Sequence, residues 1–390
     1  MRILLYLIRK MKKIAILTQP LKANYGGIIQ NYALQTILKR NGFNVETISR
    51  EYHPDASKFR VFLAHLRNET VNRILGKRKK IFSKKEADYV FSENLFFIEK
   101  HLKVSKSLYS KLDLQSYFSK NKFDIVVVGS DQTWRPKYSP DIYNYFLDFI
   151  EHDKDIIKIA YASSFGTEKW EFTEEETIRC KELVKEFDSV SVREFSGVSL
   201  CATHLNTDAQ WVLDPTLLLK ADDYKSLFEN LNYKKTGMFN YVLDRNVDKQ
   251  KFIESLSKQI NMELFTNQPE RSIDGGVIFD FDSIQNFKYP SLEGWLKSFY
   301  DADFVVTDSF HGTVFSILFN KPFLAIVNEE RGASRFYSLL KLFDLENRLI
   351  TNVRAFNENI LEENIDYDKV NQILENLREK SLLFIKSNIN

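Results

Sequence analysis

Hydrophobic and polar positions along the chain form a repeating pattern in which short apolar runs precede longer amphipathic segments. The apolar runs of the first half begin at Ile14, Asn44, Phe123, Ile156 and Asp188, and they are rich in the β-branched and aromatic residues typical of strands. Apolar positions at helical spacing recur between such runs, which is the pattern of a parallel sheet wound with helices. The sequence therefore predicts an α/β fold.

The same rhythm continues in the second half, where MFNYVL, MELFT, FVVT and KPFLAI each have the pattern of a strand. A chain of 390 residues exceeds what one compact core usually holds, and a hydrophobic content of 44% supplies apolar side chains for two cores. The segment WVLDPTLLL looks like the bridge between them, because Pro215 restricts the backbone there. We predict an N-terminal α/β domain at 11–210, a C-terminal α/β domain at 211–350, and a tail with a terminal helix at 351–390.

A charged stretch with a helical pattern, near residues 54–102, is predicted to be an addition to the first domain. Its most basic part is GKRKKIFSKK, residues 76–85. One interpretation is a solvated helical hairpin that covers the domain. The other is a surface that meets an anionic substrate or membrane headgroups.

The overall composition excludes several classes of function. The chain has 55 Lys and Arg against 53 Asp and Glu, a formal charge of +2, so no global field indicates nucleic acid. Its two cysteines are too few for a disulfide framework, which favours a reducing, cytoplasmic location. Neither cysteine lies in a metal-binding pattern, and we expect neither a metal nor a cofactor. The apolar stretch at the start, MRILLYLIRK, is too short and too charged for a signal peptide or a membrane span.

The stretch TDSFHGT places polar residues where a predicted strand meets a predicted helix. Such a helix start binds phosphate or carboxylate through its unpaired N–H groups. Gly312 allows close approach of the backbone, Ser309 and Thr313 add hydroxyl groups, and His311 can donate a proton near neutral pH. The alternative is structural: Ser309 or Asp308 caps the helix and His311 fills a polar niche in the core.

Two further strand ends carry candidate binding residues. NYGGIIQNYAL brings Asn24, Gly26, Gly27 and Gln30 to a second helix start, but it lacks the spacing of a dinucleotide or phosphate loop. A tight turn explains its glycines equally well. GSDQTW follows the strand that begins at Phe123, and its acidic and amide groups suit hydrogen bonds to sugar hydroxyls or the acceptance of a proton. The alternative there is a loop that caps the next segment. Its candidate residues are Asp131, Gln132 and Trp134.

Three arginines lie near predicted strand ends. Arg193 directly follows SVSV, and Arg331 and Arg335 lie just beyond KPFLAI. The planar guanidinium matches the geometry of carboxylate and phosphate groups. Alternatively, Arg193 pairs with Glu194 or with an acid from another domain, and Arg335 joins an ion pair on the surface.

In this order, these segments resemble the polysaccharide pyruvyl transferase family. The resemblance rests on KIAILTQPLKANYGGIIQNYALQTILKRNGFNVETI, on FDIVVVGSDQTW with YFLDF and IAYASSFG, on SVREFSGVSL with WVLDPTLLL, and on FVVTDSFHGTVFSILFNKPF. The blocks cover most of the chain from Met11 to about Arg348. Each block is loosely defined by itself, and their ordered combination is specific.

The resemblance implies two Rossmann-like domains similar to the type-B glycosyltransferase fold, with the active site between them. It also implies transfer of the pyruvyl group of phosphoenolpyruvate onto two hydroxyls of a sugar, in surface or exopolysaccharide biosynthesis. Some relatives carry an acidic pair after the N-terminal glycines, whereas this chain has Gly27, Ile28 and Ile29 there. A catalytic acid from this loop is therefore not expected.

The implied chemistry assigns roles to the candidate residues. His311 becomes the proton donor or phosphate partner, and Asp131 the base on the acceptor side. The donor site of the C-terminal domain would use Ser309, Gly312, Thr313 and the arginines. Those arginines are Arg193, Arg331 and Arg335. The acceptor site would use Asn24, Gly26, Gly27, Gln30, Gln132 and Trp134. The sequence leaves open whether the sugar acceptor is linked to a nucleotide, linked to a lipid or part of a polymer, and a lipid-linked acceptor would bring the protein to the inner face of the membrane.

Two other functions remain open from the sequence. A type-B glycosyltransferase that uses a nucleotide-sugar would share the architecture. A glycan-binding protein without catalytic activity would share it too, because a fold does not determine a function.

Overall fold

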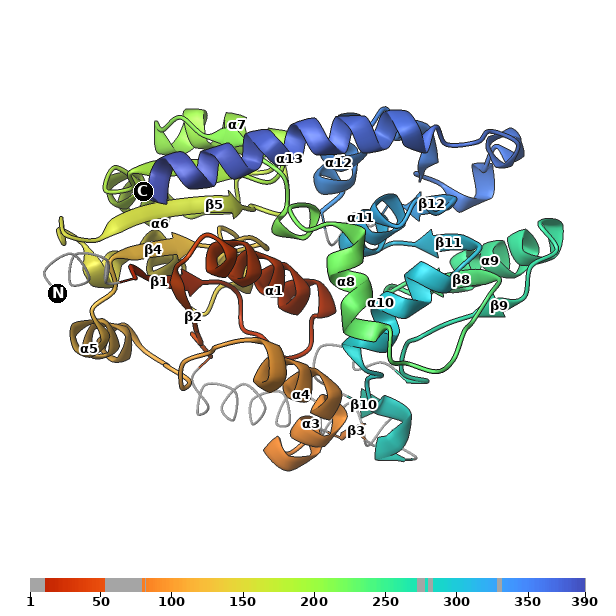
Figure 1. The fold of residues 1–390 in the computed structure, drawn as a ribbon, viewed down its shortest axis with the longest axis horizontal. Coiled ribbons are helices and arrows are strands. Elements are labelled where there is room, and N and C mark those ends of the chain that lie inside the picture. The colour runs from red at the N-terminus through yellow and green to blue at the C-terminus, as the bar shows by residue number, and fades with distance from the viewer. Residues whose placement is uncertain are drawn as a thin grey trace, which may run out of the picture.

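Two parallel sheets, each covered by helices, form the protein (Figure 1). The structure is a computed structural model that describes residues 11–52, 79–80, 82–271, 278–279, 283–327 and 332–389. The prediction of two Rossmann-like α/β domains is confirmed.

The first sheet contains six strands in the order β2-β1-β4-β5-β6-β7, and its neighbouring strands are parallel. They are β1 (Lys13–Leu17), β2 (Asn44–Ile48), β4 (Ile125–Val128), β5 (Ile157–Ser163), β6 (Ser189–Val192) and β7 (Gln210–Trp211). The main helices of this half are α1 (Tyr25–Arg40), α5 (Lys111–Asn121), α6 (Glu174–Val184) and α7 (Phe195–Leu200). Strand β4 is buried along its whole length, as its sequence IVVV predicts for a central strand.

The second sheet contains five parallel strands in the order β13-β12-β11-β8-β9. They are β8 (Met238–Tyr241), β9 (Leu264–Phe265), β11 (Phe304–Thr307), β12 (Phe323–Ile326) and β13 (Leu349–Ile350). The helices are α8 (Ala221–Phe228), α9 (Val247–Gln259), α10 (Leu292–Asp301), α11 (Phe310–Leu318), α12 (Ser334–Leu342) and α13 (Tyr367–Ile389). The carboxyl ends of parallel strands are where open α/β sheets place their ligands.

The two halves are joined by a continuous apolar core. One cluster of buried side chains includes Ile14 and Ile28 of the first half together with Val305 and Phe315 of the second. Helix α13 also returns to the first half, where the Leu213 N–H donates to Ser381 Oγ at 3.0 Å. The predicted boundary at 210/211 falls inside β7. The predicted tail, 351–390, includes α13, which contacts β5 of the first sheet.

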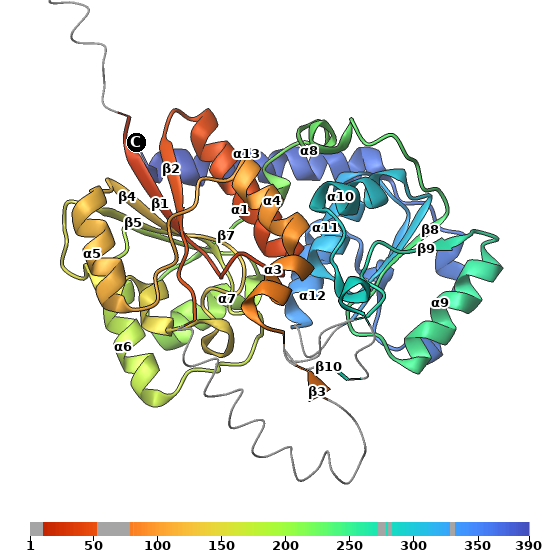
Figure 2. The same cartoon turned by 90° about the horizontal axis from the view of Figure 1, so that it is seen from below.

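The predicted helical addition near 54–102 is seen in part. Helices α3 (Lys84–Val90) and α4 (Ser92–His101) lie beside the first sheet and contact the second half, because Val90 O accepts from Tyr289 N at 2.9 Å (Figure 2). A short antiparallel pair, β3 (Lys79–Lys80) with β10 (Ile278–Phe279), lies below them. Residues 53–78, with the start of the basic stretch, lie outside the described residues. No helix in the described part of the chain is long and apolar enough to cross a membrane.

Candidate functional site

His311 lies at the contact between the two halves of the protein. It is the second residue of α11, directly after β11, and its side chain is buried. Its Nε2 is 3.7 Å from Asp214 Oδ2. On its other side, a Cβ built on Gly26 would lie 2.0 Å from His311 Nδ1, so only glycine lets the first turn of α1 approach the ring. The start of α1 and the TDSFHGT turn, which were both predicted to carry site residues, therefore lie next to each other.

Asp214 anchors this contact, although the sequence reasoning gave it no role. Its Oδ2 accepts hydrogen bonds from Arg193 Nη1 at 2.8 Å and from Ser130 Oγ at 3.1 Å. Burial disfavours the charge of this carboxyl, but the neighbouring His311 and Arg193 outweigh burial and hold the pKa of Asp214 below its ordinary value. The feature of the sequence that could have indicated a role for Asp214 is its position in WVLDPT, directly before the proline of the predicted bridge between the domains.

Arg193 lies at the carboxyl end of β6 and is almost fully buried. Its remaining nitrogens face two carboxylates at longer range: Nη2 is 3.9 Å from Asp131 Oδ1, and Nε is 3.9 Å from Glu194 Oε2. Within the described part of the chain, neither Nε nor Nη2 of Arg193 has a hydrogen-bond partner. Burial lowers the pKa of this guanidinium, yet Asp214 and Asp131 raise it overall. The Nε–Nη2 edge of the guanidinium therefore makes no direct hydrogen bond and has only the two longer-range carboxylate contacts.

Arg335 brings a second guanidinium to the same place from α12. The Cζ atoms of Arg193 and Arg335 lie 4.5 and 5.6 Å from the centre of the Phe310 ring. Burial and the charge of Arg193 lower the pKa of Arg335 to about 10. Two like charges in a buried place favour a bound anion between them. Arg331, the third predicted arginine, lies outside the described residues.

Asp131 stands in a strained loop after β4. Its φ is 74°, in the left-handed region that few residues other than glycine adopt. Asn24 Nδ2 donates to Asp131 Oδ2 at 3.0 Å, and a Cβ built on Gly27 would lie 3.2 Å from that oxygen. The start of α1 and the loop after β4 therefore meet at the carboxylate, and held strain of this kind is common at functional sites.

Ser309, Gly312 and Thr313 in the turn at the start of α11 make contacts within the fold. Ser309 Oγ accepts from Gly312 N at 3.3 Å, and Thr313 Oγ1 donates to Ser309 O at 3.2 Å. A Cβ on Gly312 would lie 2.2 Å from Thr307 Oγ1, so the glycine lets the helix pack on its own strand. The Gly312 N–H donates to Ser309 Oγ, so a phosphate at this helix start would use other N–H groups of the first turn.

Three residues predicted to contact an acceptor are engaged within the protein. Gln30 is fully buried and donates to Thr18 Oγ1 and Gly27 O, both at 3.0 Å. Gln132 Oε1 accepts from Arg135 Nη1 at 2.8 Å. Trp134 lies in the core with no exposed surface, and its indole N–H donates to Tyr145 O. As placed here, Trp134 cannot contact an acceptor, because its side chain is completely buried in the apolar core. The sequence around Trp134 contains no signal that distinguishes a tryptophan that contacts a sugar from one that fills the core.

Asp308 also has a structural role. Its carboxylate accepts from the N–H groups of Leu243 and Asp244 and from Lys249 Nζ, the last at 2.7 Å. It thus ties the end of β11 to the loop before α9. Among the described residues, no group of three or more histidine, cysteine, aspartate or glutamate side chains is arranged to hold a metal ion.

The topology and the site between the halves define an α/β protein of type-B glycosyltransferase architecture. The glycotransferase of kitacinnamycin has a similar fold, with 9% identity over 98% of this chain and 100% of that one and a TM-score of 0.50. The UDP-GlcNAc 2-epimerase of Methanocaldococcus jannaschii shares 13% identity over 94% and 92% of the two chains, with a TM-score of 0.47. Spinosyn forosaminyltransferase shares 10% identity over 95% of each chain, with a TM-score of 0.49.

The family model of polysaccharide pyruvyl transferase matches residues 24–330 of this chain. The protein belongs to this family, and the resemblance found in the sequence is confirmed. No curated protein sequence matches the chain significantly.

Proposed function

We propose that this protein transfers the pyruvyl group of phosphoenolpyruvate onto two hydroxyls of a sugar, forming a cyclic ketal and releasing phosphate. The observation that carries the proposal is the pair of buried guanidiniums beside His311. Arg193 keeps its Nε and Nη2 hydrogens without a hydrogen-bond partner in the described residues, and the guanidinium of Arg335 lies near the same Phe310 ring, with its Cζ 5.6 Å from the ring centre. A compact dianion or trianion would pair with the open Nε and Nη2 of Arg193 and be attracted by the second positive charge of Arg335, without requiring a basic protein.

The proton donor in this scheme is His311. Protonated His311 delivers a proton to the methylene carbon of the enol phosphate, which becomes a methyl group and leaves a cationic centre at the neighbouring carbon. One sugar hydroxyl then attacks that centre, and attack by the second displaces phosphate. Two C–O bonds form and the bond to the phosphate oxygen breaks. Of the two hydroxyl protons, one replaces the proton that His311 gave and the other leaves with phosphate.

Asp131 is the proposed base that accepts a proton from the attacking hydroxyl. Its Oδ1 accepts from its neighbouring Gln132 N–H at 2.9 Å and its Oδ2 from Asn24, which orient the carboxylate at the boundary of the two halves. Arg193 lies 3.9 Å away, so the base stays close to the proposed anion site. The acceptor side would then be formed by the starts of α1 and the loop after β4.

The test of this function is transfer to defined acceptors. The protein is incubated with phosphoenolpyruvate and a panel of nucleotide-linked and lipid-linked sugars, and both the acceptor mass and free phosphate are measured. We expect one acceptor to gain a pyruvyl ketal with one phosphate released per transfer. Release of a nucleoside diphosphate from a nucleotide-sugar without phosphoenolpyruvate would show that the protein is a glycosyltransferase instead.

The arginines provide the matched variants. Arg335→Ala removes a charged partner of the donor, and we expect the KM for phosphoenolpyruvate to rise by about 10- to 100-fold, the usual loss for a hydrogen bond to a charged group. Arg179→Ala removes a partly exposed arginine of α6 that pairs with Glu151, and it should leave the KM unchanged. Equal KM values for the parent and Arg335→Ala would remove Arg335 from the donor site.

A further inference from the structure

Asp214 occupies the crossover between the two halves, three residues after the end of β7 and directly before the short helix Pro215–Leu217. Its two carboxylate oxygens have separate partners. Oδ1 accepts from the N–H and the Oγ1 of Thr216, at 2.9 and 2.6 Å. Oδ2 accepts from Arg193 and Ser130 and faces His311. One oxygen therefore caps a local turn, while the other faces the proposed reaction site.

The groups around Oδ2 come from three different elements. Ser130 follows β4, Arg193 follows β6, and His311 lies in the first turn of the helix after β11 of the other sheet. The carboxylate is buried, with a residue exposure of 2%, so its interactions act with little screening by solvent. Among the charged groups described at this site, Asp214 is the one that contacts both the arginine and the histidine within 4 Å.

We infer that Asp214 is a positioning residue that orients His311 and Arg193 for the reaction, an inference that rests on the proposed function. By accepting from Nη1, it turns the Nε–Nη2 edge of Arg193 toward the donor anion. By facing Nε2, it holds the imidazole between its own carboxylate and the backbone of Gly26. Small displacements of reacting groups are costly, since a misplacement of about 1 Å lowers rates by about 100-fold.

The competing explanation is that Asp214 only caps the turn at Pro215. Two substitutions separate the oxygens. Asp214→Asn keeps an oxygen that can accept from the Thr216 N–H, but it places an amide N–H₂ where Oδ2 accepted from Arg193. Thr216→Val has nearly the same shape and removes the hydroxyl bond to Oδ1, while Oδ2 keeps its partners. We expect turnover to fall by about 100-fold in Asp214→Asn and to change by less than about twofold in Thr216→Val.

A double-mutant cycle with His311→Gln tests whether Asp214 acts through the histidine. His311→Gln removes the proton donor, which should lower turnover by about 10²- to 10⁴-fold. If Asp214 positions His311, adding Asp214→Asn to that background should lower turnover by less than about threefold, because residues that act as a unit are not additive. A further loss of about 100-fold in the double variant would overturn the positioning of His311, because Asp214 would then act through another partner such as Arg193. Parent-like turnover in Asp214→Asn would overturn the whole inference.

The parent, Asp214→Asn, His311→Gln and the double variant are also compared in urea unfolding without any substrate. The inference predicts that the stability losses of Asp214→Asn and His311→Gln are coupled, whereas additive losses would overturn it. This arm is independent of the donor. If the parent transfers nothing from phosphoenolpyruvate, the proposed function fails, while the unfolding cycle still decides whether Asp214 and His311 act together.

Discussion

Gly26 lies in the first turn of α1, where a methyl group would overlap the His311 ring at 2.0 Å from Nδ1. We predict that Gly26→Ala lowers turnover by about 100-fold, because the imidazole or the helix must shift by roughly an ångström. The free energy of unfolding should fall only modestly, since alanine stabilises the helix by about 1 kcal/mol relative to glycine and so offsets part of the cost of the overlap. Turnover per folded molecule and the midpoint of urea unfolding are the measurements.

The adjacent glycine provides the control for this prediction. A Cβ on Gly27 would meet the Asn24 Nδ2 and Asp131 Oδ2 atoms at 3.2 Å, a distance that side chains can accommodate by small movements. Gly27→Ala should therefore reduce turnover much less than Gly26→Ala does. Equal turnover in Gly26→Ala and the parent would show that the position of His311 relative to α1 has no part in the reaction.

At the scale of elements, the starts of α1 and α11 differ in how their N-terminal residue is used. Ser309 caps α11 through its hydroxyl, whereas the Asn24 side chain does not cap α1 and instead donates to Asp131. We predict that Ser309→Ala lowers stability by about 1 kcal/mol with turnover near the parent value, the usual cost of a lost cap. Asn24→Ala should lower turnover with a smaller loss of stability, because α1 loses no cap.

Measuring the melting temperature and the turnover of Ser309→Ala and Asn24→Ala tests these two predictions. Turnover lost in Ser309→Ala at unchanged stability would restore the expectation that the Ser309 hydroxyl contacts the donor. Turnover retained in Asn24→Ala would show that Asp131 needs no support from α1.

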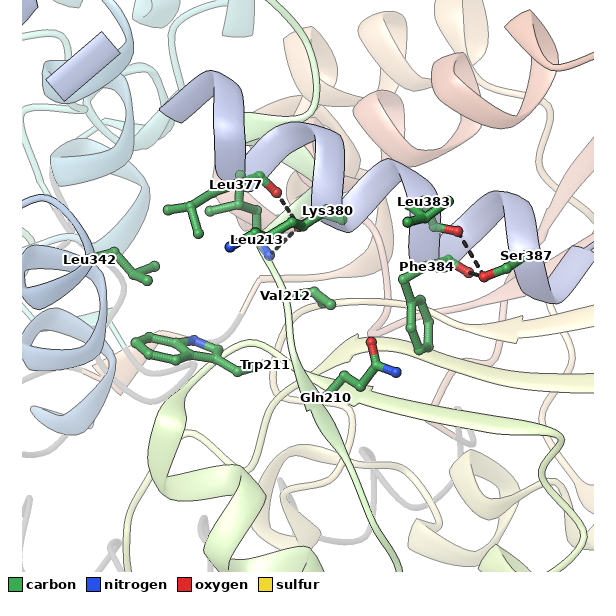
Figure 3. A pocket seen from close by; sticks show the side chains of 11 residues that line it. Gln210, Trp211, Val212, Leu213, Leu342, Leu377, Lys380, Leu383, Phe384 and Ser387 are labelled. Atoms are coloured by element: carbon green, nitrogen blue, oxygen red, sulfur yellow. Dashed lines mark hydrogen bonds between the residues drawn. The ribbon is translucent and has the colours of Figure 1, made fainter. Parts of the chain in front are cut away.

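At the scale of the whole molecule, α13 connects the end of the chain to the first sheet. Its Arg378 donates to the carbonyls of Leu217 and Leu219, and its Phe384 packs near Tyr161 of β5 with ring centres 6.1 Å apart. Figure 3 shows Phe384 and Leu383 pointing to different sides of α13, beside a groove of about 400 Å³ between this helix, β7 and α12. The helix thus braces both halves around the site.

We predict that Phe384→Ala lowers the free energy of unfolding by about 3–5 kcal/mol, because it leaves a cavity where a buried ring stood. Leu383 is 65% exposed on the same helix, so Leu383→Ala should change stability by no more than about 0.5 kcal/mol. Urea unfolding followed by circular dichroism compares the two. Equal losses in both variants would mean that α13 is not held to the first half through Phe384.

The sequence alone was sufficient for the class of fold and the family. Alternating apolar runs and amphipathic segments indicated two α/β halves because side-chain periodicity is a local property of strands and helices. Strand ends such as those before Asp131, Arg193 and His311 were also visible, since polar residues interrupt a buried apolar run at one point of the chain. These three residues approach one another in the structure, and their chemical roles stay predictions.

What each side chain contacts was decided only by the tertiary structure. Trp134 and Gln30 belong to candidate loops by sequence, yet one fills the core and the other bonds to Thr18 and Gly27. Asp214 lies 97 positions before His311 in a segment that suggested only a bridge, and packing of the two halves places its Oδ2 3.7 Å from the imidazole. The reason is physical: periodicity and turn chemistry act between neighbours in sequence, while burial, ion pairing and the space beside Gly26 depend on segments that meet only when the two sheets pack together.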